Sequence, residues 1–139
     1  MGRRGVFCQL IYHFVWSTKH RHPLITPDVE SHLYPFLVDK CKELNYGLLA
    51  LGGIEDHMHL LMELHPTQVV ADVPKMLKGS SSHFLNHVVG LSNPFYWQDG
   101  YAVITLRKDE VNKVIAYIRN QKAHHGSGVL SNTLEQLSE

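Results

Sequence analysis

Apolar positions along the chain fall into short runs typical of strands and longer stretches with helical spacing. Four runs have the β-branched, aromatic or otherwise apolar content of strands: residues 5–17, 48–54, 57–64 and 95–106. The last run is interrupted or bulged at Asp99-Gly100. The two middle runs are separated only by Glu55-Asp56, so we expect them to form a tightly joined antiparallel pair.

Helical spacing of apolar residues predicts three helices. They are expected from Pro27 to about Leu44, from Asp72 to Val88, and from Asp109 to Gly126. Pro35 lies inside the first helix and is expected to delay its start or kink it. Asp72 is the expected N-cap of the second helix, and Gly126 is expected to end the third.

The resulting order is strand, helix, strand, strand, helix, strand, helix. This order predicts an α+β, ferredoxin-like (RRM-like) domain, in which helices cover one face of an antiparallel sheet and an extra helix follows at the C-terminus. A chain of 139 residues fits one domain. We place that domain at residues 1–125 and a short tail at residues 126–139.

Charge and composition indicate where the protein acts but do not indicate a function. Thirteen Lys and Arg balance thirteen Asp and Glu, so phosphate binding would depend on a local basic face rather than on net charge. No apolar run approaches the roughly 20 residues of a membrane span, and no export signal is evident, so we expect a cytoplasmic protein that binds no membrane. Cys8 and Cys41 show no metal-ligand spacing and are expected to be reduced, buried thiols.

Histidine is over-represented: the chain has 11, where ordinary composition would give about three. His57 and His59 are two residues apart in a predicted strand, so both imidazoles leave the same face of the sheet. A neutral imidazole pair suits a divalent ion, but a third ligand must come from elsewhere. Glu63 shares this face but lies about 13 Å along the strand from His59, so it is disfavoured as that ligand. Taken alone, the pair is more typical of structural histidines.

The last predicted helix presents a phenol and an amide together. Tyr117 and Gln121 are i, i+4 neighbours on its polar face, opposite the apolar stripe. Taken alone, Tyr117 would be interpreted as an amphipathic side chain at the edge of the core.

Combined, these motifs resemble a known family. The run Gly53–Met62 is similar to the His-hydrophobe-His motif of HUH nucleases, and Tyr117–Gln121 resembles the nucleophile helix of single-tyrosine transposases of small insertion sequences, which include REP-associated tyrosine transposases. Three other stretches resemble that family in order and spacing: residues 16–25, 77–82 and 97–101. The resemblance covers about residues 5 to 125.

The resemblance implies a DNA transposase that cleaves and rejoins single-stranded DNA by metal-assisted transesterification. Tyr117 would be the nucleophile and form a 5′-phosphotyrosine, while His57, His59 and Gln121 would hold Mg²⁺ or Mn²⁺. A free phenol has a pKa near 10, so it attacks well only if the ion favours phenolate and withdraws charge from the phosphate. Such proteins recognise hairpin ends and act as homodimers whose active sites can be shared between subunits. In a prokaryotic cell, such an enzyme would act on the nucleoid.

Other polar and aromatic residues are weaker candidates. Lys19, Arg21, Lys78 and Arg119 are predicted phosphate contacts, with a solvated surface as the alternative. For His13, His124 and His125, structural or solvated roles are favoured over contacts with DNA or metal. Trp97 and Tyr101 could stack on bases, but core packing is favoured.

Two other functions stay open at this point. The chain could be a non-catalytic domain that binds single-stranded or hairpin nucleic acid, or a small metal-binding or sensor protein that binds zinc tightly. The chain also departs from the resemblance after His125, where a short neutral tail stands in place of a longer, often basic continuation.

Overall fold

A four-stranded antiparallel sheet forms the centre of the protein, whose computed structural model describes residues 5–124. The strand order is β2-β3-β1-β4. The strands are β1 (Ile11–Ser17), β2 (Gly47–Ile54), β3 (His57–Glu63) and β4 (Ala102–Leu106). With the helices described next, this order confirms the predicted ferredoxin-like α+β class.

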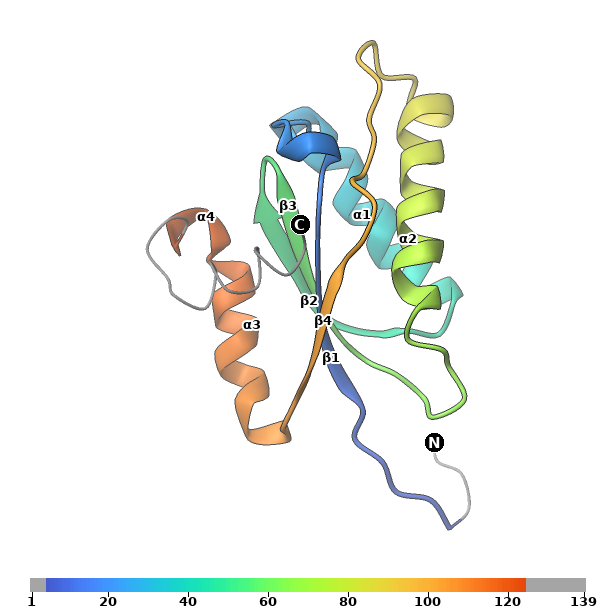
Figure 1. Cartoon of the computed structure of the whole chain (residues 1–139), viewed down its shortest axis with the longest axis vertical. Helices are drawn as coiled ribbons and strands as arrows, with labels where there is room; N and C mark the ends of the chain where they lie inside the picture. The colour runs from blue at the N-terminus through green and yellow to red at the C-terminus, as the bar shows by residue number, and fades with distance from the viewer. Residues whose placement is uncertain (1–4, 125–139) are drawn as a thin grey trace.

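Helices lie on both sides of the sheet. The main ones are α1 (Pro27–Glu43), α2 (Asp72–His83) and α3 (Val111–Arg119). Four short segments accompany them: η1 (Lys19–Arg21), the π-helix η2 (Phe84–Val89), η3 (Lys108–Glu110) and α4 (Gln121–His124). Figure 1 shows the sheet nearly edge-on, with α1 and α2 on one side and α3 and α4 on the other. The predicted extra helix therefore covers the face that α1 and α2 leave open.

The main core lies between the sheet and helices α1 and α2. Alternation along β1 and β3 sends one set of side chains to this side, where they are fully buried: Phe14, Trp16, Met58, Leu60 and Met62. Leu33 and Leu37 of α1 and Leu77 of α2 complete the packing. The alternate residues of the same strands face α3. The sheet thus separates a large apolar core from a smaller face on which polar side chains can gather.

Strand boundaries differ from the prediction at β1 and β4. β1 begins at Ile11 instead of residue 5, because its partners β3 and β4 end opposite Ile11, at Glu63 and Leu106. The segment before β4 pairs with β1's extension only through an isolated bridge between Trp97 and Thr18. Hydrogen bonds from Trp97 to Ser81 and from Lys78 to the Gln98 carbonyl hold that segment against α2.

Helix boundaries also differ in part. Pro35 does not delay α1, which begins at Pro27 with Thr26 as its N-cap. Asp72 is the first residue of α2 rather than its cap, and Ala71 takes the N-cap position. The last helix is not continuous, since α3 ends at Arg119 and α4 starts at Gln121. The expected end at Gly126 and the tail 126–139 lie outside the described residues.

The structure also bears on the cysteines and on the possibility of a membrane span. Cys41 is buried, as expected, but Cys8 is only half-buried. Within residues 5–124, no helix has the length and apolar character needed to cross a membrane.

Candidate active site

Two histidines of β3 form the centre of the polar cluster beneath α3. His57 and His59 leave the sheet on the α3 side, as predicted, and both are fully buried. Their ring centroids are 5.1 Å apart, with the rings nearly perpendicular. The intervening residues face the opposite core, so the strand fixes both imidazoles rigidly.

Each of these histidines has a separate partner for its Nδ1 atom. His57 Nδ1 lies 2.9 Å from Asp56 Oδ1, and His59 Nδ1 lies 2.9 Å from His13 Nε2. His13 comes from β1 and projects on the same face. Because Nδ1 of each ring already has a partner, Nε2 is the ring nitrogen left to bind a ligand.

Burial and neighbouring charges shift the pKa values of Asp56, His13 and His59 in this cluster. Burial alone would raise the pKa of Asp56, but the hydrogen bond with His57 and the charge of Arg21 hold that pKa below its ordinary value. Burial lowers the pKa of His13 to about 4. Burial also lowers the pKa of His59 well below its ordinary value, with help from the neighbouring His13 and His57. His13 and His59 are therefore neutral at pH 7, and a neutral imidazole is the form that binds a metal ion.

Tyr117 lies on α3 beside one histidine of this pair. Its ring meets the His59 ring edge-on, with centroids 5.5 Å apart. The tyrosine packs against two small apolar clusters, one around Leu61 and Ile118 and one around Val15 and Ala102. Its hydroxyl oxygen is covered. The phenol and the imidazoles of one chain therefore meet in the folded monomer.

Gln121 is brought to the same place by the break between α3 and α4. The backbone at Asn120 leaves the helical conformation, with φ −103° and ψ 23°, and α4 starts at the next residue. Gln121 is buried, and its Oε1 lies 3.1 Å from His57 Nε2. The predicted constellation of two imidazoles, one phenol and one amide is thus assembled within a single chain.

The donor atoms fit a cation. If His57 donates its Nδ1–H to Asp56, its Nε2 carries a lone pair that faces Gln121 Oε1, which is also an acceptor. Two facing acceptors need a proton, a rotated amide or a cation between them. His59 Nε2 and Gln121 Nε2 are buried and make no well-aligned hydrogen bond among the described residues, although the Gln121 side chain interacts with the His59 ring. Buried polar atoms without a well-aligned hydrogen bond are explained if a ligand such as a cation binds between them.

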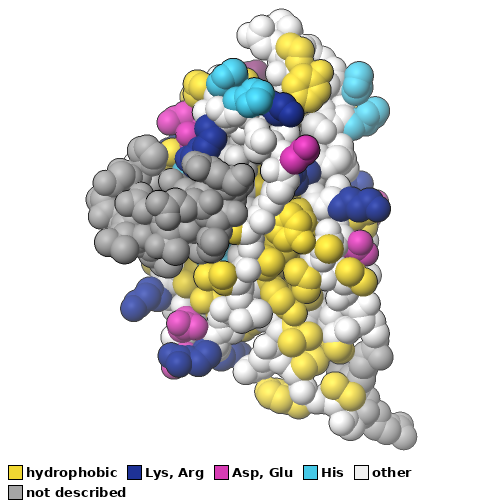
Figure 2. All heavy atoms as spheres, in the orientation of Figure 1, with side chains coloured by type: hydrophobic (Ala, Val, Ile, Leu, Met, Phe, Trp, Pro, Cys, Tyr) yellow, Lys and Arg dark blue, Asp and Glu magenta, His cyan; other side chains and the backbone are white. Residues whose placement is uncertain are grey.

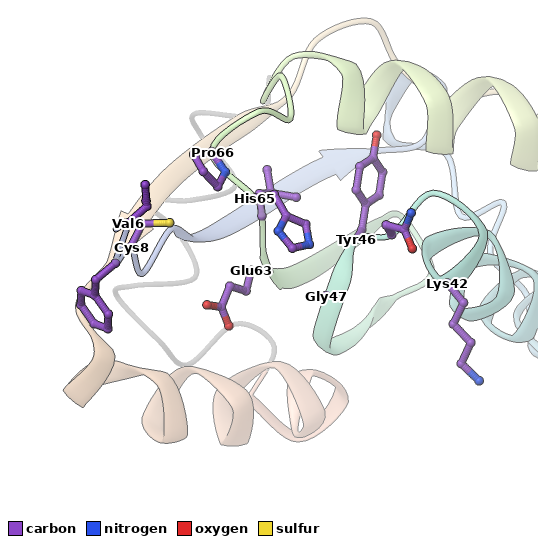
Figure 3. Close-up of a pocket in the computed structure, with 11 residues that line it drawn as sticks. Val6, Cys8, Lys42, Tyr46, Gly47, Glu63, His65 and Pro66 are labelled. Atoms are coloured by element: carbon purple, nitrogen blue, oxygen red, sulfur yellow. The ribbon is translucent and has the colours of Figure 1, made fainter. Parts of the chain in front are cut away.

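The third donor here is an amide and not a carboxylate. Within residues 5–124, no three His, Cys, Asp or Glu side chains are grouped to hold a metal ion. Glu63, the disfavoured alternative, is exposed at the opposite end of β3. It lines a separate hollow of about 660 Å³ with residues that include Tyr46 and His65. Figure 3 shows these side chains. That hollow contains none of the candidate catalytic side chains.

Two of the four predicted phosphate contacts have internal partners. The Arg21 guanidinium lies 3.5 Å from Asp56, and so it supports the carboxylate that orients His57. Lys78 donates to the carbonyl oxygens of Gln98 and Gly100, at 2.7 and 2.8 Å. These contacts give Lys78 a structural role that its charge did not reveal.

The other two basic candidates are accessible: Arg119 is exposed and Lys19 is half-exposed. Figure 2 shows Lys and Arg side chains spread around one face, several beside acidic residues, instead of forming one patch. Lys19 and Arg119 stay predictions as DNA contacts.

Aromatic packing matches the favoured interpretation for Trp97. It is buried and donates to Ser81 Oγ, which joins the segment before β4 to α2. Tyr101 is 36% exposed and lies near Lys75 and Lys78, so it does not belong to the buried core. His125 lies outside the described residues, and the side chain of His124 is not placed.

Known proteins are similar to this chain in sequence and in fold. Residues 6–121 match the family described as "Transposase IS200 like". The ISDra2 transposase TnpA of Deinococcus radiodurans is 28% identical over 123 residues, which cover 85% of this chain and 88% of that protein. The transposase for insertion sequence element IS200 of Salmonella typhimurium is 30% identical, over 79% of this chain and 75% of the other.

Two solved structures of transposases have a similar fold. A crystal structure of a putative transposase from Deinococcus radiodurans superposes with a TM-score of 0.70 at 31% identity, covering 87% of this chain and 97% of the other. A REP-associated tyrosine transposase bound to a REP hairpin gives 0.65 at 16% identity, covering 91% and 74%, a likeness of fold alone. Because the family match spans most of the chain, this protein belongs to the IS200-like transposase family.

Proposed function

We propose that this transposase cleaves and rejoins single-stranded DNA by transesterification, with Tyr117 as the nucleophile. The observation that carries the proposal is the edge-on contact between Tyr117 and His59, beside the His57–Gln121 pair. A phenol beside an imidazole that could hold a divalent ion is placed where the ion could favour the phenolate. Tyr117 also packs against two small apolar clusters, so its contact with His59, rather than its burial, supports a role in a reaction.

The reaction exchanges one phosphate ester for another. The Tyr117 oxygen attacks the scissile phosphorus, the bond to the 3′ oxygen breaks, and the leaving strand takes a proton to end in a 3′-hydroxyl. The 5′ phosphate stays bound to Tyr117 as a phosphotyrosine. Attack by a 3′-hydroxyl reverses the step and frees the tyrosine, so strands rejoin without an external energy source.

A divalent ion, Mg²⁺ or Mn²⁺, would be held by His57, His59 and Gln121. When bound, it would withdraw charge from the phosphate and favour the phenolate of Tyr117. Asp56 and His13 would orient the imidazoles, and the rigid strand β3 would fix the distance between them. Imidazole also suits zinc, so the identity of the ion needs a direct measurement.

Access to the nucleophile requires movement. The hydroxyl of Tyr117 and the amide of Gln121 are both covered in this structure. The apolar cluster that holds α3 on the sheet is small, with Val114 and Ile118 as its buried helix residues. We infer that α3 shifts away from the sheet when DNA enters, and that the substrate phosphate then replaces the contact between the helix and the histidines.

Hairpin recognition and dimerisation complete the proposal. A protein of the same fold is bound to a REP hairpin, and we extend hairpin DNA to this chain as its substrate class. We also propose a homodimer. In the described monomer, Tyr117 meets His59 of its own chain, which predicts an active site contained in one subunit.

The direct test is a covalent adduct. Wild-type protein, a labelled DNA hairpin with single-stranded flanks, and Mn²⁺ should give a protein–DNA species that survives denaturing electrophoresis. Tyr117→Phe should bind the hairpin but form no adduct, while Tyr96→Phe, which changes a phenol that is 56% exposed, should behave as wild type. Binding without any adduct from the wild-type protein would favour a non-catalytic nucleic-acid-binding domain. Tight zinc binding without DNA affinity would favour a metal sensor.

Mixing variants tests how the active site is assembled. Sedimentation should first show a dimer. Tyr117→Phe and His59→Ala subunits are each expected to be inactive, and a mixed dimer should stay inactive if each site belongs to one chain. Recovery of adduct in the mixture would instead show that one subunit supplies the tyrosine and the other the histidine.

A further inference from the structure

His13 makes a contact with the candidate metal site that its residue type alone does not explain. It is almost fully buried on β1, and its Nε2 lies 2.9 Å from His59 Nδ1. The two rings are 5.1 Å apart and tilted by 45°. In the register of β1 and β3, Val15 stands opposite His59 and His13 opposite Leu61, so the two histidines are diagonal neighbours on one face.

Only one hydrogen atom can lie between these two nitrogens, because they are only 2.9 Å apart. If His13 donates, His59 accepts through Nδ1 and must carry its own proton on Nε2. If His59 donates, its Nε2 keeps a lone pair. The same hydrogen bond therefore decides whether His59 can act as a metal ligand at all.

The surroundings of His59 Nε2 favour the second arrangement. This atom is buried and makes no well-aligned hydrogen bond among the described residues, and the polar side chain that interacts with the ring from the helix side is the Gln121 amide. A proton there would have only the Gln121 amide as an acceptor, poorly aligned and already 3.1 Å from His57 Nε2, and a cation could not bind beside it. A lone pair at the same place is satisfied as soon as a cation binds.

We propose that His13 is a positioning residue, which accepts the Nδ1–H of His59 and so keeps the Nε2 lone pair of His59 available to the cation. This inference rests on the proposed function, since it takes His59 as a ligand. It gives each ligand histidine its own acceptor: the Asp56 carboxylate for His57 and the His13 imidazole for His59. The two ligands are consequently unequal, because a carboxylate strengthens its histidine more than a neutral ring does.

Two substitutions separate this role from simple packing. His13→Phe keeps a planar ring of similar size but removes the acceptor, whereas His13→Gln supplies an amide oxygen that can accept the same hydrogen. His13→Phe should lower the affinity for Mn²⁺ by about 10–100-fold, in line with losses seen when second partners of ligand histidines are removed. His13→Gln should recover most of that loss. His32→Gln, which changes a histidine of α1 far from the cluster, serves as the control.

Nitrogen NMR of the imidazoles reads the hydrogen position directly. In wild-type protein with Mg²⁺, Nδ1 of His59 should be the protonated nitrogen, and in His13→Phe the proton should shift to Nε2. Thermal unfolding in EDTA is measured beside these data, because a purely structural residue would change the melting temperature and leave the tautomer as it was.

Two results would overturn the role of His13. One is a wild-type His59 that carries its proton on Nε2 in the presence of metal. The other is equal Mn²⁺ affinity in the folded wild-type and His13→Phe proteins. Either can occur while the wild-type protein still forms its Tyr117 adduct, which leaves the proposed function intact. If wild-type protein binds Mn²⁺ more tightly than His13→Phe but never forms an adduct, the role of His13 holds and the proposed function fails.

Discussion

Gly52 of β2 lies so close to the end of α3 that a Cβ built on it would stand 2.5 Å from the Ile118 carbonyl oxygen. Gly52 is also the residue of β2 that stands opposite His59 of β3. The missing side chain therefore lets α3 approach the sheet at the level of the histidines. Tyr117 precedes Ile118 by one residue and Gln121 follows it by three, so this approach places both over the cluster.

Gly52→Ala should accordingly force α3 away from the histidines. We expect a destabilisation of about 1–3 kcal/mol, typical of overpacking, together with weaker Mn²⁺ binding. Chemical denaturation and calorimetric titration measure the two effects. Gly79→Ala is the matched control, because nothing lies within 4 Å of that position and alanine is the better helix former, so it should stabilise by about 0.5–1 kcal/mol. Unchanged metal binding in a destabilised Gly52→Ala would refute the link between this contact and the site.

Gln121→Ala should weaken Mn²⁺ binding by at least about tenfold, or 1.4 kcal/mol, since it removes one of three proposed ligands. Gln121→Glu should retain binding, because a carboxylate oxygen also suits Mn²⁺. Asn120→Ala changes the neighbouring amide, which is exposed and bonded to the Ala116 carbonyl, and should leave affinity unaltered. If Gln121→Ala binds Mn²⁺ as the wild type does, the amide is not a ligand.

Lys78 and Lys19 should respond differently to removal of their charge. Lys78→Met loses two hydrogen bonds to the Gln98–Gly100 segment, so we expect a lower melting temperature with little change in the salt dependence of DNA binding. Lys19→Met should instead weaken DNA binding and reduce the slope of log affinity against log salt by about one. The opposite pattern, with Lys78 governing the slope, would restore Lys78 as a phosphate contact.

The Cys41 thiol is expected to be inert in the native protein. It is buried in α1, and burial raises its pKa from 9.0 to about 12. A thiol reagent at pH 8 should therefore label one cysteine per native chain and two after unfolding, and Cys8→Ser should leave none reactive before unfolding. Rapid native labelling of Cys41 would show that α1 opens locally.

The same shift sets a direction for stability against pH. Below pH 9 the thiol is protonated in both states, so it adds no pH dependence. Between pH 9 and about 12 the folded state keeps a proton that the unfolded state has lost, so stability falls as pH rises. Cys41→Ala should show a shallower alkaline loss in denaturation experiments. An identical loss in both proteins would mean that other groups, such as Tyr34, whose pKa is also raised by burial, account for it.

Local sequence patterns determined the class of fold and one half of the candidate site. The β-branched and aromatic content of the strands, the spacing of apolar residues in the helices and the turn at Glu55-Asp56 predict the order of elements that the structure has. The period of two along β3 places His57 and His59 on one face and the methionines on the other. These features follow from neighbours within a few residues, where backbone geometry alone fixes direction.

Only the tertiary structure decided which distant residues meet. The contact of His13 with His59, the closeness of Gly52 to Ile118 and the hydrogen bonds of Lys78 to two carbonyl oxygens each join separate elements, and no period in the sequence encodes them. The break at Asn120 belongs here too, because the helical pattern continued through it while packing turned Gln121 toward His57. Sequence specifies directions along each element, whereas the distance between elements depends on how all their side chains pack together.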